Sequence, residues 1–241
     1  MKRGSSRLAT IGGGGEDRSE PFFWWGSRPG RRPVATLEQL IELGMLAPSA
    51  ARLLLDLIDE GTSIFVVSQA AGAGKSTLLA ALLAECDTSR KTLYLRGSYE
   101  TFDFLKTADP LTHRLAVNEL SPHLPIYLWG KPVTRFLSTS KAGYQLLATA
   151  HAASVAGFVQ SLITPPLDID WEVASLPKAV TVLAECHRPG IALSCVQEIT
   201  SVSRGNWPGR FQLSTLYQKN AVRDSASSGR DTCPDQRLDG S

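Results

Sequence analysis

The chain has 241 residues and a formal net charge of +2, from 25 Lys and Arg against 23 Asp and Glu. Hydrophobic residues make up 43% of the chain and charged residues 20%, which excludes global disorder and a membrane-embedded protein. The small net charge excludes a surface built throughout to neutralise phosphates, so we do not expect nucleic acid as a partner.

The two ends of the chain differ from its middle. Residues 1–33 carry seven basic and three acidic residues and have no helical or strand period, which predicts a flexible basic N-terminal arm. The aromatic cluster Phe22–Trp25 in this arm either docks on the domain or contacts a partner. Residues 221–241 almost lack large apolar side chains and are predicted to be a disordered tail. Residues 34–220 are therefore expected to form a single domain.

Helix signals open this domain, and strand signals follow. Thr36 and Gln39 have capping-box spacing before a helix that stops at Gly44, and a second helix is expected from Pro48 to Gly61. The apolar run Ser63–Ser68 is typical of a buried parallel strand. Further strands are expected at Thr92–Gly97, Arg114–Leu120 and Tyr144–Ala152, with helical stretches after several of them. This alternation predicts an α/β fold with a mainly parallel central sheet flanked by helices.

A C-terminal antiparallel hairpin is predicted at an edge of this sheet. The segments AVTVLAEC and IALSCVQEI flank the turn residues Pro189 and Gly190. The four cysteines form no CxxC pair, so we expect reduced structural thiols. Cys186, His187 and Cys195 have the spacing of two sides of a hairpin rather than of a metal site.

The most informative segment is VVSQAAGAGKSTLLAALLAE, in which an apolar strand runs into small residues and then into a leucine-rich helix. Strand, glycine-rich turn and helix are the context of a phosphate-binding loop, or Walker A motif. Lys75 would reach the β- and γ-phosphates of ATP, and the Ser76 hydroxyl would ligate Mg²⁺. The pattern departs from its usual form at one position, where Gln69 replaces the first glycine. The predicted nucleotide-binding residues are Ala70, Ala71, Gly72, Ala73, Gly74, Lys75, Ser76 and Thr77.

From Leu37 to Ile199 the sequence resembles the ATPases of type II and type IV secretion systems and of Flp-type pilus assembly. The resemblance implies a P-loop NTPase of the RecA-like fold, in which the first two helices correspond to linker helices. Three short motifs after the phosphate loop also resemble this family, each at the end of a predicted strand. They are LYLRGSYETFDF with Glu100, LAVNEL with Glu119, and GYQLLATAHA with His151.

The resemblance implies a catalytic role for each of these three residues. Glu119 would orient the attacking water, Glu100 would act near Mg²⁺, and His151 would sense the γ-phosphate. The other histidines, His113, His123 and His187, receive no role. Without the family order, Glu119 is better explained as a solvated strand end. Glu100 could equally lie in a surface turn, and His151 could equally be a hydrogen-bonded core histidine.

The sequence thus predicts an ATP-binding, ATP-hydrolysing hydrolase that uses ATP and Mg²⁺. The alternative is a nucleotide-binding regulatory or scaffold subunit with little hydrolysis, which Gln69, Asn118 and the absence of the family's N-terminal domain favour. A P-loop small-molecule kinase is the third interpretation, although no acceptor site or arginine-rich lid is evident. As partners we expect a homo-oligomer or proteins of a secretion or pilus machine. The chain has no run of about 18 apolar residues that an integral membrane segment needs, and no secretory signal. We therefore expect a cytoplasmic protein, with peripheral attachment at the inner face of the membrane through partners as an alternative.

Overall fold

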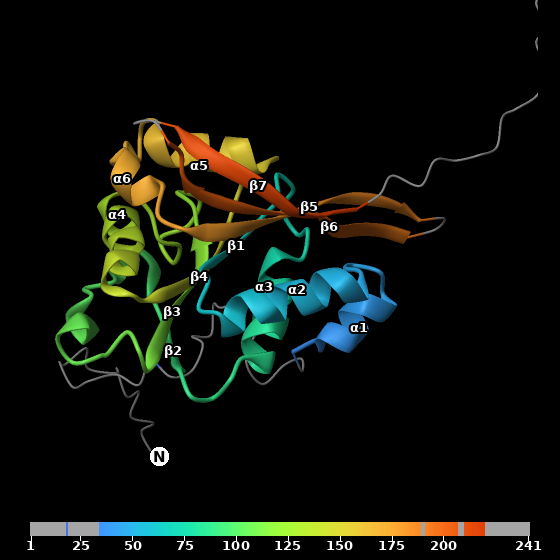
Figure 1. The fold of residues 1–241 in the computed structure, drawn as a ribbon, viewed down its shortest axis with the longest axis horizontal. Coiled ribbons are helices and arrows are strands. Elements are labelled where there is room, and N and C mark those ends of the chain that lie inside the picture. Colours follow the sequence, from blue (N-terminus) through green and yellow to red (C-terminus); the bar gives the residue numbers. More distant parts are fainter. Residues whose placement is uncertain (1–17, 19–33, 189–190, 207–209, 220–241) are drawn as a thin grey trace, which may run out of the picture.

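The computed structural model describes residues 18, 34–188, 191–206 and 210–219 (Figure 1). The predicted arm, apart from Arg18, and the predicted tail lie outside the described residues, as does the aromatic cluster Phe22–Trp25. The predictions made for these segments therefore stay predictions.

The centre of the fold is a seven-stranded mixed sheet with the order β2-β3-β4-β1-β5-β6-β7. The five strands from β2 to β5 in this order are parallel, while β6 runs antiparallel to both β5 and β7. The predicted α/β class with a mainly parallel sheet and an antiparallel hairpin is confirmed. The strands are β1 (Ile64–Val67), β2 (Lys91–Tyr94), β3 (His113–Leu120), β4 (Gln145–Ala150), β5 (Lys178–Arg188), β6 (Ile191–Arg204) and β7 (Phe211–Gln218).

Helices cover both faces of the sheet and divide the core into two clusters. On one face α1 (Leu37–Glu42), α2 (Pro48–Asp59) and α3 (Lys75–Glu85) pack against Ile64 and Val66 of β1. On the other face α4 (Lys131–Ser138), α5 (Val155–Ile163) and α6 (Trp171–Ala174) pack against Phe65 and Val67 (Figure 1). Because β1 is apolar on both faces, it is buried throughout. No helix among the described residues is long and apolar enough to cross a membrane.

The first two helices begin where the capping box and the proline in the sequence predict them. Thr36 caps α1 by accepting a hydrogen bond from the Gln39 backbone N–H at 3.2 Å, and the Gln39 side chain accepts one from the Thr36 N–H at 3.0 Å. Pro48 occupies the first turn of α2, where its missing N–H costs no hydrogen bond. Short 3₁₀ turns, η1 (Gly97–Tyr99), η2 (Asp103–Lys106) and η3 (Thr139–Ala142), complete the connections.

The predicted hairpin is present, but it does not end the sheet. Strand β6 pairs with β5 on one side and with β7 on the other (Figure 1). The sequence analysis missed β7, because all eight of its residues are at least partly exposed and form no buried apolar stripe. The base of the hairpin contacts the α1–α2 connection, where the Val196 N–H donates to the Met45 carbonyl at 2.7 Å.

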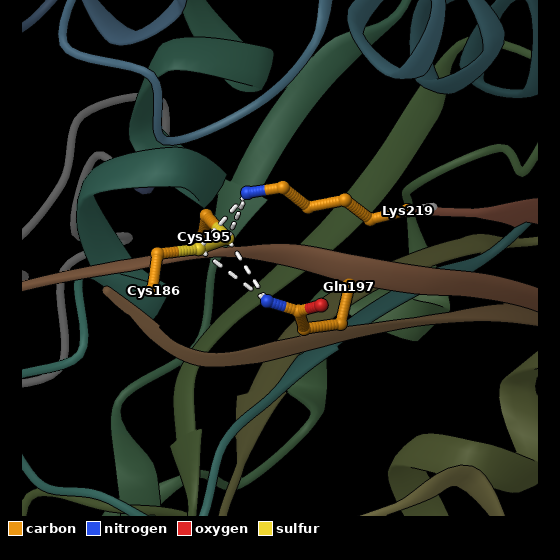
Figure 2. The surroundings of a disulfide bond; sticks show 4 residues. All are labelled: Cys186, Cys195, Gln197 and Lys219. Carbon is orange, nitrogen blue, oxygen red and sulfur yellow. Dashed lines mark hydrogen bonds between the residues drawn. A yellow bond between two sulfur atoms is a disulfide. The ribbon is translucent and has the colours of Figure 1, made fainter. Parts of the chain in front are cut away.

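The expectation of reduced thiols is wrong for two cysteines, because Cys186 of β5 and Cys195 of β6 form a disulfide (Figure 2). The strand register pairs Ala184 with Cys195, which makes the two cysteines diagonal neighbours across the hairpin. Lys219 Nζ donates to both sulfur atoms, at 3.0 and 2.8 Å, and Gln197 Nε2 does so at 3.4 and 3.0 Å. Sequence spacing alone does not reveal a bridge that depends on this register. Cys86, by contrast, is a free thiol.

Candidate functional site

The candidate site lies at the carboxyl ends of β1, β3 and β4. Strands β1 and β4 are neighbours, but β1 leads into α3 on one face of the sheet and β4 leads into α5 on the other. Two parallel strands whose connections diverge in this way leave a crevice outside their carboxyl ends, where ligands bind in open α/β sheets. The loop after β1 is the predicted phosphate-binding loop.

This loop has a backbone that its residues adopt without strain. Gly72 and Gly74 take positive φ angles of 73° and 84°, which favour glycine. Among the described residues only Phe102 and Asp168 combine a side chain with positive φ, so Gln69 does not strain the loop entrance. The Ser68 hydroxyl accepts a hydrogen bond from the Ala70 N–H at 3.3 Å and holds the turn. Replacement of the usual glycine therefore does not disturb the backbone at this point.

Lys75 is the first residue of α3 and turns its side chain back over the loop. Its Nζ donates to the Ala70 carbonyl at 3.3 Å, and the residue is 5% exposed. Burial lowers the pKa of the Lys75 ammonium, and the nearby negative charge of Glu119 opposes that shift. Gly74 caps the helix with no side-chain hydrogen bond. The positive end of α3 and the Lys75 ammonium thus lie together at the loop, an arrangement that suits an anion.

Strand β3 carries a β-bulge close to this loop. Val117 pairs with Ala148, but the next pair is Leu120 with Ala150, so β3 carries one extra residue within Asn118 and Glu119. The bulge breaks the alternation that would place these adjacent residues on opposite faces of the sheet.

Asn118 in this bulge contacts both neighbouring elements. Its side-chain oxygen accepts a hydrogen bond from the Ser76 hydroxyl at 3.3 Å, and its carbonyl accepts one from the Thr149 hydroxyl at 2.5 Å. Ser76 and Asn118 therefore present two oxygen atoms side by side at the start of α3. Oxygen donors of this kind are those that Mg²⁺ prefers.

Glu119 lies against a histidine from β4. Its Oε1 atom is 2.9 Å from Nε2 of His151, the residue directly after β4, and the two side chains are 10% and 24% exposed. The ring of His123 packs edge-on to that of His151, with centroids 5.0 Å apart. Burial and then the charge of Glu119 raise the pKa of the Tyr127 phenol. The structure thus brings together predicted residues from three strand ends.

Glu100, the third predicted catalytic residue, has partners outside this group. Its buried carboxylate accepts hydrogen bonds from Arg18 Nη1 at 2.5 Å, from the Arg96 N–H at 3.0 Å and from the Phe102 N–H at 2.8 Å. Arg18 also pairs with the edge of the sheet, because its carbonyl accepts from the Tyr94 N–H at 3.0 Å. None of these partners belongs to the phosphate loop, and the contacts hold Arg18 against the edge of the sheet.

Two residues of this neighbourhood received no role in the sequence analysis. Asn118 counted only as a feature that favours the alternative with little hydrolysis, yet its amide connects β3 to Ser76. His123 lies in the loop after β3, and no sequence pattern places it beside His151. The bulge and the fold of that loop bring Asn118 and His123 to the site, so a sequence motif alone would not identify them.

Comparison with known proteins shows a partial structural similarity to a solved structure. No protein-family model and no curated protein matches the chain. Among solved structures, the chain is similar to the VirB11 ATPase of the Brucella suis type IV secretion system, crystallised in complex with sulphate. The TM-score is 0.44 and the sequence identity is 18%, over 73% of this chain and 59% of that one. The chain thus spans well under two thirds of that protein's length, and a likeness at this level does not define a family.

Proposed function

We propose that the protein binds Mg²⁺ and ATP at the loop Ala70–Thr77 and hydrolyses the nucleotide. The observation that carries this proposal is the convergence of five groups at the carboxyl ends of β1 and β3. Lys75 and the helix N-terminus supply positive charge, Ser76 and Asn118 supply oxygen ligands, and Glu119 supplies a carboxylate. Phosphoryl transfer requires positioning and charge neutralisation rather than covalent chemistry from the protein, and these groups are suited to both.

Each side chain has a defined task in this proposal. The loop amides and Lys75 hold the phosphates, and Ser76 with Asn118 holds Mg²⁺, which when bound offsets the negative charge of the phosphate oxygens. Glu119 orients the attacking water at the open side of the crevice. His151, 2.9 Å from Glu119, fixes the direction of that carboxylate. We assign Glu100 a structural rather than a catalytic task.

The test measures ATP binding and phosphate release by the purified chain. Lys75→Ala should abolish binding, whereas Lys106→Ala should leave it unchanged, because Lys106 is 78% exposed and forms a surface ion pair with Asp103. Glu119→Gln should keep binding and lower phosphate release by about 100-fold or more, the usual size of a general-base contribution. Unchanged ATP affinity in Lys75→Ala would refute the proposal.

A second candidate, a nucleotide-binding regulatory subunit, is favoured by two specific observations. The Glu119 carboxylate lies 2.9 Å from His151 Nε2 rather than open toward a water, and Asn118 stands where a second carboxylate could assist the metal. This candidate predicts measurable ATP affinity with phosphate release no faster than that of Glu119→Gln. Release that is clearly faster than that control would exclude it.

The resemblance to secretion and pilus-assembly ATPases motivates a further part of the proposal. ATP would promote assembly of the chain into a homo-oligomer within such a machine. Size-exclusion chromatography with light scattering, with and without ATP and Mg²⁺, tests this part. A monomer under both conditions would contradict it and would favour a monomeric switch.

A further inference from the structure

We propose that Glu119, His123 and His151 form a binding site for a divalent transition-metal cation of the Zn²⁺ type. This site is distinct in its ligands from the Mg²⁺ position at Ser76. It uses one carboxylate and two imidazoles, from the end of β3, from the loop that follows β3, and from the end of β4.

The three side chains already lie close to the separation that such a cation needs. One ligand atom from each lies within 4.8 Å of the others, and the Glu119 Oε1 to His151 Nε2 distance is 2.9 Å. Ligand atoms of a tetrahedral zinc ion are about 3.3 Å apart, because each lies about 2.0–2.1 Å from the metal. Changes of up to about 1.5 Å in the distances between ligand atoms therefore suffice to complete the site.

The types of donor atom select the class of cation. Two imidazole nitrogens and one carboxylate oxygen suit zinc and neighbouring transition metals, whereas Mg²⁺ and Ca²⁺ prefer oxygen ligands throughout. Two histidines and a glutamate, with a fourth position left for water, form the donor set of several catalytic zinc sites.

An independent observation at Glu119 indicates a missing ligand. Its Oε1 atom is buried and has no hydrogen-bond partner among the described residues, although it lies 2.9 Å from His151 Nε2. The atom faces His151 Nε2 without the geometry of a hydrogen bond. A buried carboxylate oxygen without a hydrogen bond is costly, and a cation between these two atoms would remove that cost.

The loop that carries His123 is held in place before any metal binds. Leu128 brackets it, because its N–H donates to the Glu119 carbonyl at 3.0 Å and its carbonyl accepts from the Ser121 N–H at 3.2 Å. The Ser121 hydroxyl accepts from the His123 N–H at 3.2 Å, and the Ser98 hydroxyl donates to the Tyr127 carbonyl at 2.9 Å. Ligands on such a supported backbone lose little entropy when the metal binds.

Metal binding and ATP hydrolysis would compete for one carboxylate. When Glu119 ligates zinc it no longer orients water, so zinc should inhibit phosphate release. This consequence rests on the proposed function, whereas the metal site itself does not.

The direct experiment is a zinc titration of the 241-residue chain without nucleotide. The protein is stripped with a chelator, and zinc binding is followed by calorimetry and by competition with a zinc-responsive dye near neutral pH. We expect one zinc ion per chain, and cobalt bound in its place should give the visible absorption of a tetrahedral site. His123→Gln should weaken zinc affinity at least about tenfold, a typical cost of disturbing a zinc site. Because His123 is exposed, this variant should fold as the parent does, which circular dichroism checks.

The matched control is His113→Gln, a substitution at the opposite end of β3. The His113 ring hydrogen-bonds to Thr112 and the Asp109 carbonyl and is not one of the three candidate ligands, so its replacement should leave zinc affinity unchanged. The proposal is overturned if no stoichiometric binding occurs, or if His123→Gln binds zinc as tightly as the parent chain. Loss of zinc inhibition in His123→Gln, relative to its own zinc-free rate, would support the competition. Zinc binding by a chain that hydrolyses no ATP would reject only the hydrolysis.

Discussion

Glu100→Gln separates the two roles that the sequence and the structure give this residue. The resemblance assigns Glu100 to catalysis, whereas the structure makes its carboxylate the acceptor of three hydrogen bonds. Oε2 receives those from Arg18 Nη1 and the Arg96 N–H, and Oε1 receives that from the Phe102 N–H. The glutamine keeps one oxygen for Phe102 and turns an NH₂ group toward the two other donors. It therefore removes the charge and two of the three hydrogen bonds.

The expected loss of unfolding free energy in Glu100→Gln follows from how deeply the ion pair is buried. The Glu100 side chain is 0% exposed and that of Arg18 is 16% exposed, so the ion pair is almost fully shielded from water. Hydrogen bonds to charged groups contribute about 1.5–3 kcal/mol each, and breaking one side of a buried pair costs about 3–5 kcal/mol. Because Arg18 retains some contact with water, we expect the free energy of unfolding to fall by about 3 kcal/mol.

The assay is denaturant unfolding followed by far-ultraviolet circular dichroism, together with ATP affinity. The matched control is Glu60→Gln at an exposed position, which should change the unfolding free energy by less than about 0.5 kcal/mol. Combining Glu100→Gln with Arg18→Met should give a coupling energy of about 1–3 kcal/mol. A loss of stability below about 1 kcal/mol, with a large loss of ATP affinity, would refute the structural role and restore the catalytic one.

Three further substitutions or treatments test other parts of the fold. Gly97→Ala should lower the unfolding free energy by at least about 3 kcal/mol, because a Cβ there would lie 2.1 Å from the Ile126 carbonyl oxygen at a φ of 66°; thermal unfolding measures this. Burial lowers the pKa of Lys178 to about 7, so the unfolded chain binds one more proton between pH 7 and about 10. Stability of the parent relative to Lys178→Met should therefore rise with pH in this window, and a flat difference would contradict the shift. Reduction of the Cys186–Cys195 disulfide should lower the free energy of unfolding, measured with denaturant, by up to about 3 kcal/mol, because the disulfide closes a short loop. An unchanged unfolding free energy would indicate that the thiols are already reduced.

Local patterns were sufficient to predict most of the core of this fold. The capping box at Thr36, Pro48 at the start of α2 and the apolar run of β1 act within a few residues, so the sequence analysis located these elements closely. Strands β2, β3 and β4 were found in the same way. Strand β7 was missed because its side chains are largely exposed and it forms only by pairing with β6.

Contacts between distant segments were beyond the sequence patterns. Arg18 and Glu100 are 82 residues apart, and the pairing of Cys186 with Cys195 depends on the register of a hairpin. Nothing local distinguishes a glutamate that anchors a distant arginine from one that ends a strand beside a nucleotide. The order of motifs in a resembling family could therefore suggest a role for Glu100, but only its hydrogen-bond partners could define one.

The bulge in β3 explains how the site gains residues, such as Asn118, beyond those that the sequence motifs predict. In a regular strand Asn118 and Glu119 would point to opposite faces, and only one could reach the crevice. The extra residue lets Asn118 bond to Ser76 at the start of α3 while Glu119 faces His151 at the end of β4. One inserted residue thus links the phosphate loop to a carboxylate and a histidine. It also leaves that carboxylate close enough to His123 for a metal to bind, so the same distortion supports both proposals made for this edge of the sheet.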